Sequence, residues 1–533
     1  MKNLRVLSLA VAIVVLPLAS ALGAVICVPS SFDGSCASSQ ATIAAAVVAA
    51  AGGDTVWVAP GTYTEQIIVN KQLILRGAQF GTDARGRVAG VSPSPATETV
   101  LNYGLGRIVE LQLGSAQSVI DGFAFAPTTA QRGIESTSGP LDNLDILNNH
   151  FQGCSSAVFL NDNGVDVDVA QNVFKSSTGT QVHLDQDNFD GLHFTNNWVQ
   201  SGAGTGLFVD GNHNVGVSST PRSPEISGNT FSANVTGANL GSRAFEYGTI
   251  SGNTISNNLG PGLQGGIQHS TISGNSFLSN GNNPSYAPRG GLELTSFGNT
   301  AVDRGAQNTA ITSNYFSGNA RGVVFSGTQA NDTISTNTFS CNAVIGNATG
   351  AYLGASTNAD IIAGENNWWG CNAGPGNAGC DSVVIDGASN NSMDFDPWIV
   401  MAVTAAPPIL VFPPGGTVTI SADFTTNSDG AAAPCTVPDG TPVTFAGGSC
   451  GTVDPVAAST SGGVATTTFT ASCGSGTASD ITAQAGGEAV PVDPPLEFQT
   501  LEAVPAVSPA GLAVLALLLG VLAAVVLGRR LAF

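Results

Sequence analysis

Three four-residue phrases in the middle of the chain carry the side chains best suited to binding or acid–base chemistry. Residues 158–161, 182–185 and 207–210 read Val-Phe-Leu-Asn, Val-His-Leu-Asp and Leu-Phe-Val-Asp, at steps of 24 and 25 residues. Because side chains alternate between the two faces of a strand, the second and fourth residues of each phrase share the outward face. The phrases therefore predict a column of rings beside columns of amides and carboxylates. The ring column is Phe159, His183 and Phe208, and the polar columns are Asn161, Asp185 and Asp210, then Asn163, Asp187 and Asn212.

Two glutamates are expected on the same face, because Glu135 and Glu293 follow Gly-Ile and Gly-Leu in comparable strand phrases. Rings beside acceptors suit a saccharide, since the rings pack on the apolar face of a sugar and the acceptors bind its hydroxyls. We therefore predict a ligand-binding face. Its candidate residues are Phe159, Asn161, His183, Asp185, Asp187, Phe208, Asp210 and Glu293.

Three alternatives remain open for this face. Asp185, Asp187 and Asp210 offer the oxygen ligands that Ca²⁺ takes, so calcium is the one metal that the sequence suggests. Two of the carboxylates could instead form an acid/base pair. The face could also be a solvated polar surface without a ligand. Lys175 and Arg289 are the cations nearest to the acidic column in sequence, and neither is clearly placed over it.

The element that must position these residues is a repeat. Of the 40 Asn residues, 37 lie between residues 102 and 391, and a short phrase of Asn, any residue and an apolar or aromatic residue recurs within that stretch. Most steps between these phrases are 22–25 residues, a period typical of a solenoid. Short strands with Asn and Gly turns favour one coil of a parallel β-helix per repeat, with Asn in structural turns. The apolar ends of the phrases are Phe151, Phe174, Val199, Phe231, Ile255, Phe277, Phe316, Phe339 and Trp369.

The first and last coils resemble a known family. Residues 41–46 (Ala-Thr-Ile-Ala-Ala-Ala), 52–65 (Gly-Gly-Asp-Thr-Val-Trp-Val-Ala-Pro-Gly-Thr-Tyr-Thr-Glu) and 365–375 (Glu-Asn-Asn-Trp-Trp-Gly-Cys-Asn-Ala-Gly-Pro) are similar to the N-terminal cap and the closing coil of right-handed parallel β-helix proteins of the pectate-lyase-like superfamily. The resemblance covers residues 25–398 and implies a capped solenoid. It implies no single activity, because the superfamily contains lyases, hydrolases, epimerases, esterases and binding proteins.

No catalytic motif of that superfamily is present. The chain lacks the Asp-Asp, Gly-His-Gly and Arg-x-Lys set of polygalacturonases and the Tyr-Gly-x-Asp-Pro-His phrase of alginate epimerases. His183 beside Asp185 is more often a surface pair than a general base. The sequence therefore favours a binding protein, and no catalytic residue is assigned.

The two ends predict export. Residues 1–24 have the basic start, apolar core and small residues of a signal peptide. Residues 509–530 contain about twenty apolar residues before Arg529 and Arg530, long enough for a transmembrane helix. This tail resembles the IPTL-CTERM type of sorting signal, which implies an exosortase-like processing protease and a membrane-anchored precursor. We therefore expect a location at the cell surface or outside the cell.

The nine cysteines fit an oxidising compartment. Cys27 with Cys36 and Cys371 with Cys380 are close enough in sequence to pair. Cys154 and Cys341 have no near neighbour, and the odd number leaves at least one thiol unpaired within the chain. Three more lie in the last domain, at Cys435, Cys450 and Cys473.

The last domain differs from the repeat. Residues 402–490 contain alternating strands at 417–422, 441–445 and 463–471, which predict a small sandwich that resembles bacterial Ig-like spacer domains. Residues 491–508 read as a Pro-rich linker. The expected fold class is all-β: a right-handed parallel β-helix, a small Ig-like β-sandwich and a C-terminal transmembrane helix.

The net charge of the chain narrows the range of possible functions. A formal net charge of -21 excludes the basic surface that nucleic-acid binding requires. We expect an exported, cell-surface-anchored or released β-helix protein that binds carbohydrate or acts in adhesion, with a polysaccharide or a cell-surface glycan as partner. The alternatives are a polysaccharide lyase or glycoside hydrolase acting on acidic polysaccharide, and a structural surface rod without a ligand.

Overall fold

The computed structural model describes most of the chain. The described residues are 23–30, 35–87, 92–185, 189–210, 223–285, 287, 289–295, 306–327, 336–356, 359–406, 415–473, 476–498, 514 and 516–519. The side chains of 189–190, 210 and 242–244 are not described. Residues 1–22 of the expected signal peptide, Asp187, and most of the expected tail at 509–530 lie outside the described residues. Among the residues that are described, no helix is long and apolar enough to span a bilayer.

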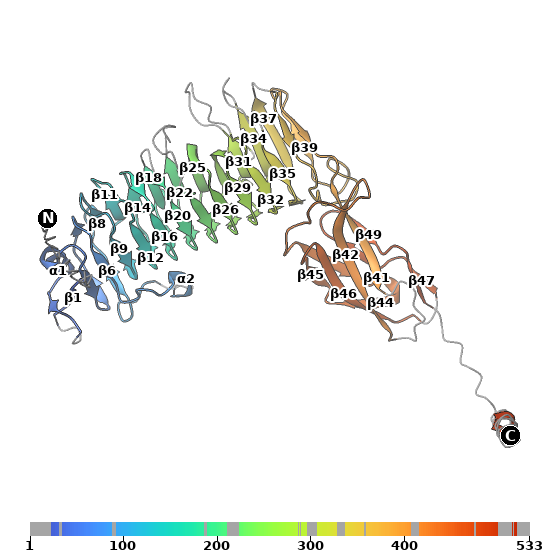
Figure 1. Ribbon diagram of the computed structural model, residues 1–533, viewed down its shortest axis with the longest axis horizontal. Coiled ribbons are helices and arrows are strands. Elements are labelled where there is room, and N and C mark those ends of the chain that lie inside the picture. Colours follow the sequence, from blue (N-terminus) through green and yellow to red (C-terminus); the bar gives the residue numbers. More distant parts are fainter. Residues whose placement is uncertain are drawn as a thin grey trace, which may run out of the picture. The chain divides into compact units, whose positions relative to one another are not determined.

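The chain forms two compact units, which divide after Glu225. In both units the strands stack coil upon coil in parallel sheets (Figure 1). Within the second unit the sandwich shares a hydrophobic core with the last coils, in which Ala343 and Trp368 join Phe424 and Phe469.

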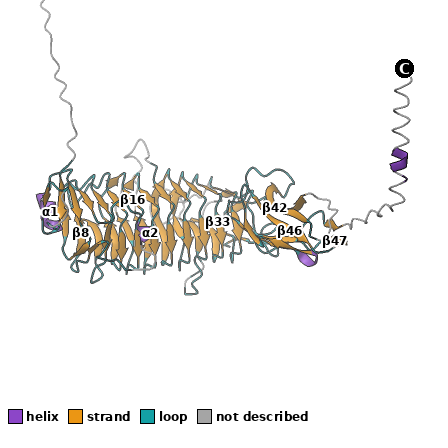
Figure 2. Ribbon diagram, turned by 90° about the horizontal axis from the view of Figure 1, so that it is seen from below, coloured by secondary structure: helices purple, strands orange, loops and turns teal. Residues whose placement is uncertain are grey.

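The first unit begins with a capped coil. Helix α1 (Ile43–Ala49) lies against the first strands at the N-terminal end of the unit (Figure 2). Thr42 caps the helix by accepting from the amide of Ala45 at 3.1 Å, and the Glu65 carboxylate accepts from the amides of Ile43 and Ala44 at 3.0 and 2.8 Å. These contacts satisfy the amides that a helix start leaves open. The predicted cap is therefore present.

Each coil of the first unit contributes strands to three parallel sheets, named here sheets 1, 2 and 3. Sheet 1 contains β2 (Ser38–Ser39), β1 (Val25–Val28), β3 (Thr55–Val58), β6 (Ile74–Arg76), β9 (Val119–Asp121), β12 (Asp145–Leu147), β16 (Asp168–Ala170) and β20 (His193–Thr195). Sheet 2 contains β4 (Gly61–Tyr63), β7 (Thr99–Leu101), β10 (Phe123–Phe125), β13 (His150–Gln152), β17 (Val173–Lys175) and β21 (Trp198–Gln200). Sheet 3 contains β5 (Ile67–Val69), β8 (Arg107–Leu111), β11 (Arg132–Ser136), β14 (Ser156–Leu160), β18 (Val182–Asp185) and β22 (Thr205–Asp210). β15 (Gly164–Val165) pairs with β19 (Phe189–Asp190).

The coils of the second unit have the same three-sheet plan. Sheet 1 contains β23 (Glu225–Ser227), which starts on the last residue of the first unit, β26 (Thr249–Ser251), β29 (Thr271–Ser273), β32 (Ala310–Thr312), β35 (Thr338–Ser340), β38 (Ile361–Ala363) and β40 (Ser392–Asp394). Sheet 2 contains β24 (Thr230–Ser232), β27 (Thr254–Ser256), β30 (Ser276–Leu278), β33 (Tyr315–Ser317) and β36 (Ala343–Ile345). Sheet 3 contains β25 (Thr236–Glu246), β28 (Leu263–Gln268), β31 (Gly290–Thr295), β34 (Arg321–Gly327), β37 (Ala351–Ser356) and β39 (Val383–Ile385).

The sandwich in the second unit consists of antiparallel strands. One sheet contains β41 (Ile399–Ala406), β42 (Thr417–Asn427), β46 (Val464–Ala471) and β44 (Gly451–Asp454), and η1 (Gly448–Cys450) precedes β44. The other contains β45 (Ala457–Ser459), β43 (Pro442–Ala446), β48 (Thr482–Gln484) and β49 (Ala489–Pro491). β47 (Gly476–Ala478) pairs with β50 (Leu496–Phe498). These strands begin at Ile399 and end at Phe498, so the start of the expected linker at 491–508 belongs to the sandwich.

Buried rings stack inside the coils. In the first unit the rings of Phe125 and Phe151 lie 4.4 Å apart, and those of Phe151 and Phe174 lie 5.1 Å apart. In the second unit Phe277 and Phe316 lie 4.8 Å apart. These distances follow from the spacing of about 4.8 Å between paired strands. Identical positions of successive coils therefore pack directly on one another.

Asparagine ladders join the coils, which confirms the structural interpretation of the repeated Asn. Each buried side chain accepts from the amide of the equivalent Asn one coil earlier, at 2.8–3.0 Å in the main ladder. The main ladder contains Asn149, Asn172 and Asn197 in the first unit and Asn229, Asn253, Asn275, Asn314, Asn342 and Asn367 in the second. The left-handed backbone lies one residue before the ladder Asn, at Asn148 and Gly252 for example, with φ of 54° and 63°.

A second ladder was not recognised in the sequence. It joins Asn234, Asn258, Asn280, Asn319 and Asn347 in the second unit, and it ends on the Asp381 carboxylate. Burial raises the pKa of Asp381, and its hydrogen bonds from Asn347 and Gly346 act in the opposite direction. Asp381 replaces the Asn that a further coil would supply.

One repeat was placed on the wrong strand by the sequence pattern. Phe339 pairs with Ile311 in sheet 1, whereas the residue that follows Phe316 in sheet 2 is Val344. The ladder residue of this coil is accordingly Asn342 and not Asn337. The phrase misleads because Asn337 makes a similar hydrogen bond one sheet earlier, to the amide of Thr309.

Four disulfides are formed among the described residues. Cys27 pairs with Cys36 and Cys371 with Cys380, the two pairs expected from sequence distance. Cys450 pairs with Cys473, and Cys341 in the last coils pairs with Cys435 in the sandwich. Cys154 is buried and unpaired, and burial raises its pKa to about 12. Cys341 had no near neighbour in sequence because its partner lies 94 residues away.

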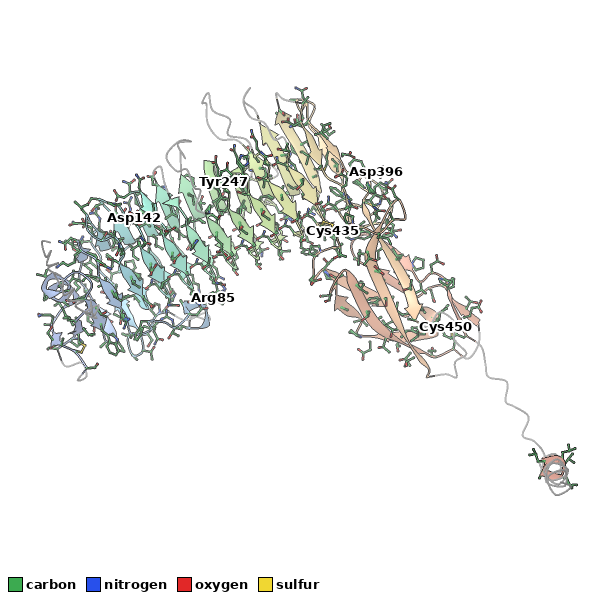
Figure 3. The ribbon with its side chains drawn as sticks, in the orientation of Figure 1. Arg85, Asp142, Tyr247, Asp396, Cys435 and Cys450 are labelled. Atoms are coloured by element: carbon green, nitrogen blue, oxygen red, sulfur yellow. A yellow bond between two sulfur atoms is a disulfide. The ribbon has the colours of Figure 1, made fainter. Side chains whose placement is uncertain are left out.

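An extension of the first unit covers part of sheet 2. Helix α2 (Ala84–Arg87) packs through Ala84 against Val173 and Trp198, and it carries Arg85 and Arg87 (Figure 3). The neighbouring outward residue, His150, is fully buried, and neither ring nitrogen has a hydrogen-bond partner. Burial, and then the positive charges of Arg87 and Lys175, lower the pKa of His150 to about 4.

Loss of a ladder side chain is expected to destabilise the second unit. Asn275→Ala removes the acceptor for the Asn253 amide at 2.9 Å and the donor to the Ile250 carbonyl at 2.9 Å. Two buried backbone groups without partners cost about 3 kcal/mol. Urea unfolding should show this loss, whereas Asn282→Ala, on an exposed amide, should change the unfolding free energy by less than about 0.5 kcal/mol. Equal effects of the two variants would contradict the ladder.

Protonation of His150 is expected to destabilise the first unit in acid. The unfolded chain binds this proton near pH 6.5, but the folded chain binds it only near pH 4. The stability is therefore present above pH 6.5 and is lost as the pH falls toward 4, by about 3 kcal/mol. His150→Phe should flatten this part of the pH profile of the unfolding free energy. His269→Phe, at an exposed position of the second unit, should leave the profile unchanged.

Candidate functional site

The ring column predicted from the sequence lies in register on sheet 3 of the first unit. Glu135 pairs with Phe159, Phe159 with His183, and His183 with Phe208. Glu110 pairs with Glu135 one coil earlier. The predicted register is therefore confirmed, and we name these five residues the sheet 3 row.

The rings of the row contact one another edge to face. Phe159 and His183 lie 4.8 Å apart with an interplanar angle of 80°, and His183 and Phe208 lie 4.9 Å apart at 67°. All three side chains are partly exposed. The Arg132 guanidinium lies over the Phe159 ring, 3.9 Å from its centroid. One face of the Phe159 ring is therefore occupied by a cation.

Two arginines bind the carboxylates at the start of the row. Arg107 donates to Glu135 at 2.7 Å and lies 3.2 Å from Glu110, and Arg132 also pairs with Glu135. Burial would raise the pKa of Glu110, but hydrogen bonds from Gln112, Arg107 and Thr137 outweigh it, so the pKa is lowered. Glu110 therefore remains ionised and is a poor proton donor.

This network corrects the expectation about cations near the row. Lys175 lies on β17 in sheet 2, and Arg289 belongs to the second unit, so neither contacts the row within the first unit. The signal for Arg107 and Arg132 was present in the sequence. Both stand three residues before a glutamate, and the two Arg-x-x-Glu phrases are 25 residues apart, which is one coil.

The polar column beside the row is partly described. Asp185 pairs with Asp210 in register, and Asp185 is partly exposed. Asn161 is exposed just after β14, and its amide donates to Ser136 Oγ at 2.7 Å. Asp187 and the side chain of Asp210 are outside the described residues. No group of three His, Cys, Asp or Glu side chains within the described part of the chain could hold a metal ion. The calcium set Asp185, Asp187 and Asp210 thus stays a prediction.

Glu293 lies on sheet 3 of the second unit. Its side chain is 5% exposed, and it accepts from Arg289 at 2.7 Å and from the Gly290 amide at 2.6 Å. Burial raises the pKa of Glu293, and the charge of Arg289 partly offsets this effect. Within its own unit Glu293 is therefore a buried carboxylate paired with the more exposed Arg289.

A second arrangement of titratable groups lies on sheet 1 of the first unit. Asp145 pairs in register with Asp168, and Asp168 with His193. His193 Nδ1 lies 2.8 Å from Asp168 Oδ1. Burial, then the charges of Asp168 and Asp121, raise the pKa of Asp145 to about 6. These residues were not predicted from the sequence, although their steps of 23 and 25 match the coil period.

A comparison with protein families supports the fold. A family model described as a right-handed β-helix region matches residues 180–368. No curated protein matches the chain. The family match and the parallel sheets together identify the solenoid as a parallel β-helix of the right-handed type.

Several solved structures are similar at low sequence identity. The Dettilon tailspike protein gp208 is 11% identical, with 80% of this chain and 89% of that chain covered and a TM-score of 0.40. The catalytic unit of the GH87 α-1,3-glucanase from Streptomyces thermodiastaticus strain HF3-3 is 16% identical, with 66% of this chain and 65% of that chain covered and a TM-score of 0.43. The Streptococcus pneumoniae surface protein and adhesin PfbA is 12% identical, with 66% and 92% covered and a TM-score of 0.30. The similarity assigns no activity to this chain.

Proposed function

We propose that this chain is an exported protein, displayed on the cell surface or released, that binds an extended saccharide along the sheet 3 row. The observation that carries this proposal is the register of Glu135, Phe159, His183 and Phe208 on four successive coils. A ligand that lies along the coils would contact a new side chain at each strand spacing of about 4.8 Å. A chain molecule with repeated units suits such a surface.

The chemistry of the row suits the two kinds of surface on a sugar. The partly exposed edges and faces of His183 and Phe208 can pack on the apolar C–H face of a sugar ring. The Glu110 and Glu135 carboxylates are buried, and the oxygens of both already accept hydrogen bonds. The side chains of Arg107 and Arg132, which are 33% and 39% exposed and are held by these carboxylates, are the polar groups of this region that can donate to a sugar hydroxyl. Arg132 also fixes Phe159 from one side.

Calcium is the cofactor that fits the remaining predicted residues. The net charge of -21 disfavours an acidic polysaccharide unless a cation bridges it to the protein. Asp185 and Asp210 on adjacent strands, with Asp187, would supply oxygen ligands for Ca²⁺. The proposal therefore has a metal-independent form for neutral saccharides and a calcium-dependent form for acidic ones.

The remaining parts of the proposal concern export. Four disulfides are consistent with an oxidising compartment. The signal peptide at 1–24, the Ig-like character of the sandwich, and the IPTL-CTERM-type tail at 509–530 with its membrane anchor and exosortase-like protease belong to this proposal. In this arrangement the sandwich would act as a spacer between the binding rod and the cell envelope.

A second candidate is polysaccharide hydrolysis, favoured by one observation on sheet 1. Asp145 keeps its proton up to about pH 6 beside Asp168, which accepts from His193. Two neighbouring carboxyl groups, one of which carries a proton, are the pair that glycoside hydrolysis needs. We rank hydrolysis second because the ring column predicted from the sequence lies on sheet 3, whereas Asp145 and Asp168 lie on sheet 1.

Removal of a ring from the row is expected to weaken saccharide binding. Phe208→Ala and His183→Ala should each raise the Kd for the bound polysaccharide about tenfold, the equivalent of about 1.4 kcal/mol of lost contact. The measurement is calorimetric titration on a polysaccharide panel, with Ca²⁺ and with EDTA. Tyr247→Ala is the matched control, because Tyr247 is an exposed ring of the second unit stacked on His269 at 4.8 Å (Figure 3).

A separate variant tests the calcium-dependent form of the proposed binding. Asp185→Ala should abolish only the binding that EDTA removes, whereas the ring variants should weaken both forms. Binding that neither ring variant changes would contradict the sheet 3 row as the site.

The hydrolase candidate predicts a product with a defined pH dependence. Oligosaccharides should be released fastest below about pH 6, because Asp145 loses its acid proton above that pH. Asp145→Asn and Asp168→Asn should each lower the rate at least 100-fold. Asp423→Asn, a substitution in the sandwich, should leave the rate unchanged. The absence of any reducing-sugar product from the whole panel would eliminate this candidate.

A further inference from the structure

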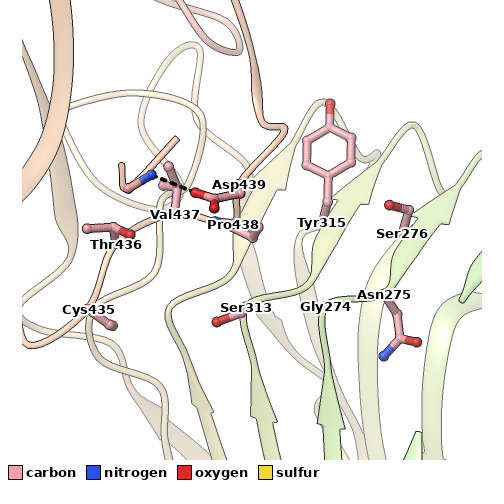
Figure 4. Close-up of a pocket in the computed structure, with 11 residues that line it drawn as sticks. Gly274, Asn275, Ser276, Ser313, Tyr315, Cys435, Thr436, Val437, Pro438 and Asp439 are labelled. Carbon is pink, nitrogen blue, oxygen red and sulfur yellow. Dashed lines mark hydrogen bonds between the residues drawn. The ribbon is translucent and has the colours of Figure 1, made fainter. Parts of the chain in front are cut away.

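A cavity of about 620 Å³ lies in the second unit between the coils and the sandwich. Figure 4 shows Ser276, Ser313 and Tyr315 on the strands and turns of the coils, and Thr436 and Asp439 on the sandwich loop. The volume falls in the range of about 300–1,000 Å³ that small-molecule sites occupy. The cavity is separate from the sheet 3 row, which belongs to the other unit.

The wall on the coil side is rigid. Ser276 and Tyr315 start strands β30 and β33, and each follows a ladder residue, Asn275 or Asn314. The Asn275 side chain accepts a hydrogen bond from the Asn253 backbone amide at 2.9 Å, and the Asn275 backbone amide donates one to the Asn314 side chain at 3.0 Å. The Tyr315 ring is partly buried against the shared hydrophobic core. The ladder therefore fixes the positions from which these side chains project.

The wall on the sandwich side is also fixed. The Cys341–Cys435 disulfide ties the start of the loop to the coils. Thr441 and Thr460 donate to the Pro438 carbonyl at 2.7 and 2.8 Å. Asp439 Oδ1 accepts from the Gly462 amide at 2.7 Å. A cavity with two fixed walls loses little conformational entropy when a ligand enters.

The lining selects one class of ligand. It offers one carboxylate, four hydroxyl groups and one aromatic ring, and no lysine or arginine lines it. An anion would be repelled by Asp439, and a purely apolar molecule would leave the polar side chains without partners. No trio of metal-binding side chains is present among the described residues. A neutral sugar fits, since its hydroxyls both donate to a carboxylate and accept from Ser or Thr, and its C–H face packs on a tyrosine ring.

We propose that this cavity between the coils and the sandwich is a second saccharide site, one that binds a short neutral oligosaccharide between Tyr315 and Asp439. The site would hold a sugar within the second unit, independently of the sheet 3 row. It does not depend on the proposed function, because none of its residues belongs to that row.

The test uses the full chain that carries both Phe208→Ala and His183→Ala, so that binding at the sheet 3 row is strongly weakened. The probes are cellotetraose, xylotetraose, mannotetraose and laminaritetraose, and the readout is saturation-transfer NMR with calorimetric titration. We expect at least one probe to bind. Ser276→Trp should abolish this binding by filling the cavity, and Asp439→Asn should raise the Kd about tenfold. Asp439→Asn keeps an acceptor for the Gly462 amide, so it reports on binding even if Ser276→Trp is poorly folded.

Thr230→Trp is the matched control, because Thr230 lies two coils before Ser276 in the same outward row of sheet 2 and does not line the cavity. It should leave binding unchanged. No binding of any of the four probes overturns the proposal, as does binding that Ser276→Trp and Asp439→Asn leave intact. A probe that binds the unsubstituted chain but not the chain with Phe208→Ala and His183→Ala would place the saccharide on the sheet 3 row alone. That result would also overturn the proposal.

Discussion

The hydrogen bond from one buried asparagine to the backbone of the preceding coil is the interaction on which this structure depends. Each ladder Asn satisfies a turn amide in the coil before it, and its own amide is satisfied by the next Asn. The turns therefore cannot slip relative to one another without leaving buried polar groups unpaired. This fixes the register of the strands on either side of each turn that carries a ladder Asn.

Fixed register has two consequences. Inside the coils, Phe151 packs on Phe174 and Phe277 on Phe316, so the core is continuous along each unit. Outside, residues with no structural duty are brought into rows that the sequence separates by about 25 positions. Phe159, His183 and Phe208 form one such row, and Asp145, Asp168 and His193 form another. A solenoid of this kind can thus present long surfaces that differ from face to face.

The sequence predicted the solenoid and the sheet 3 ring register because both follow from period and alternation, which are local properties. It misplaced Phe339, since Asn337 and Asn342 both make hydrogen bonds of the ladder type on different sheets. It also missed Arg107 and Arg132, whose contacts with Glu135 depend on which side chains share a face across coils. The Cys341–Cys435 pair and the cavity beside Tyr315 need the packing of the sandwich on the coils, which no repeat pattern contains.

The central claim is that a saccharide lies along the sheet 3 row. A crystal structure of the protein with a bound oligosaccharide, chosen from the polysaccharide that binds most tightly, tests this claim most directly. We predict sugar density that follows successive coils over His183 and Phe208, with hydroxyl groups within hydrogen-bond distance of Arg107 or Arg132. Density that instead lies over Asp145 and Asp168 on sheet 1, with the sheet 3 row free of sugar, would contradict it.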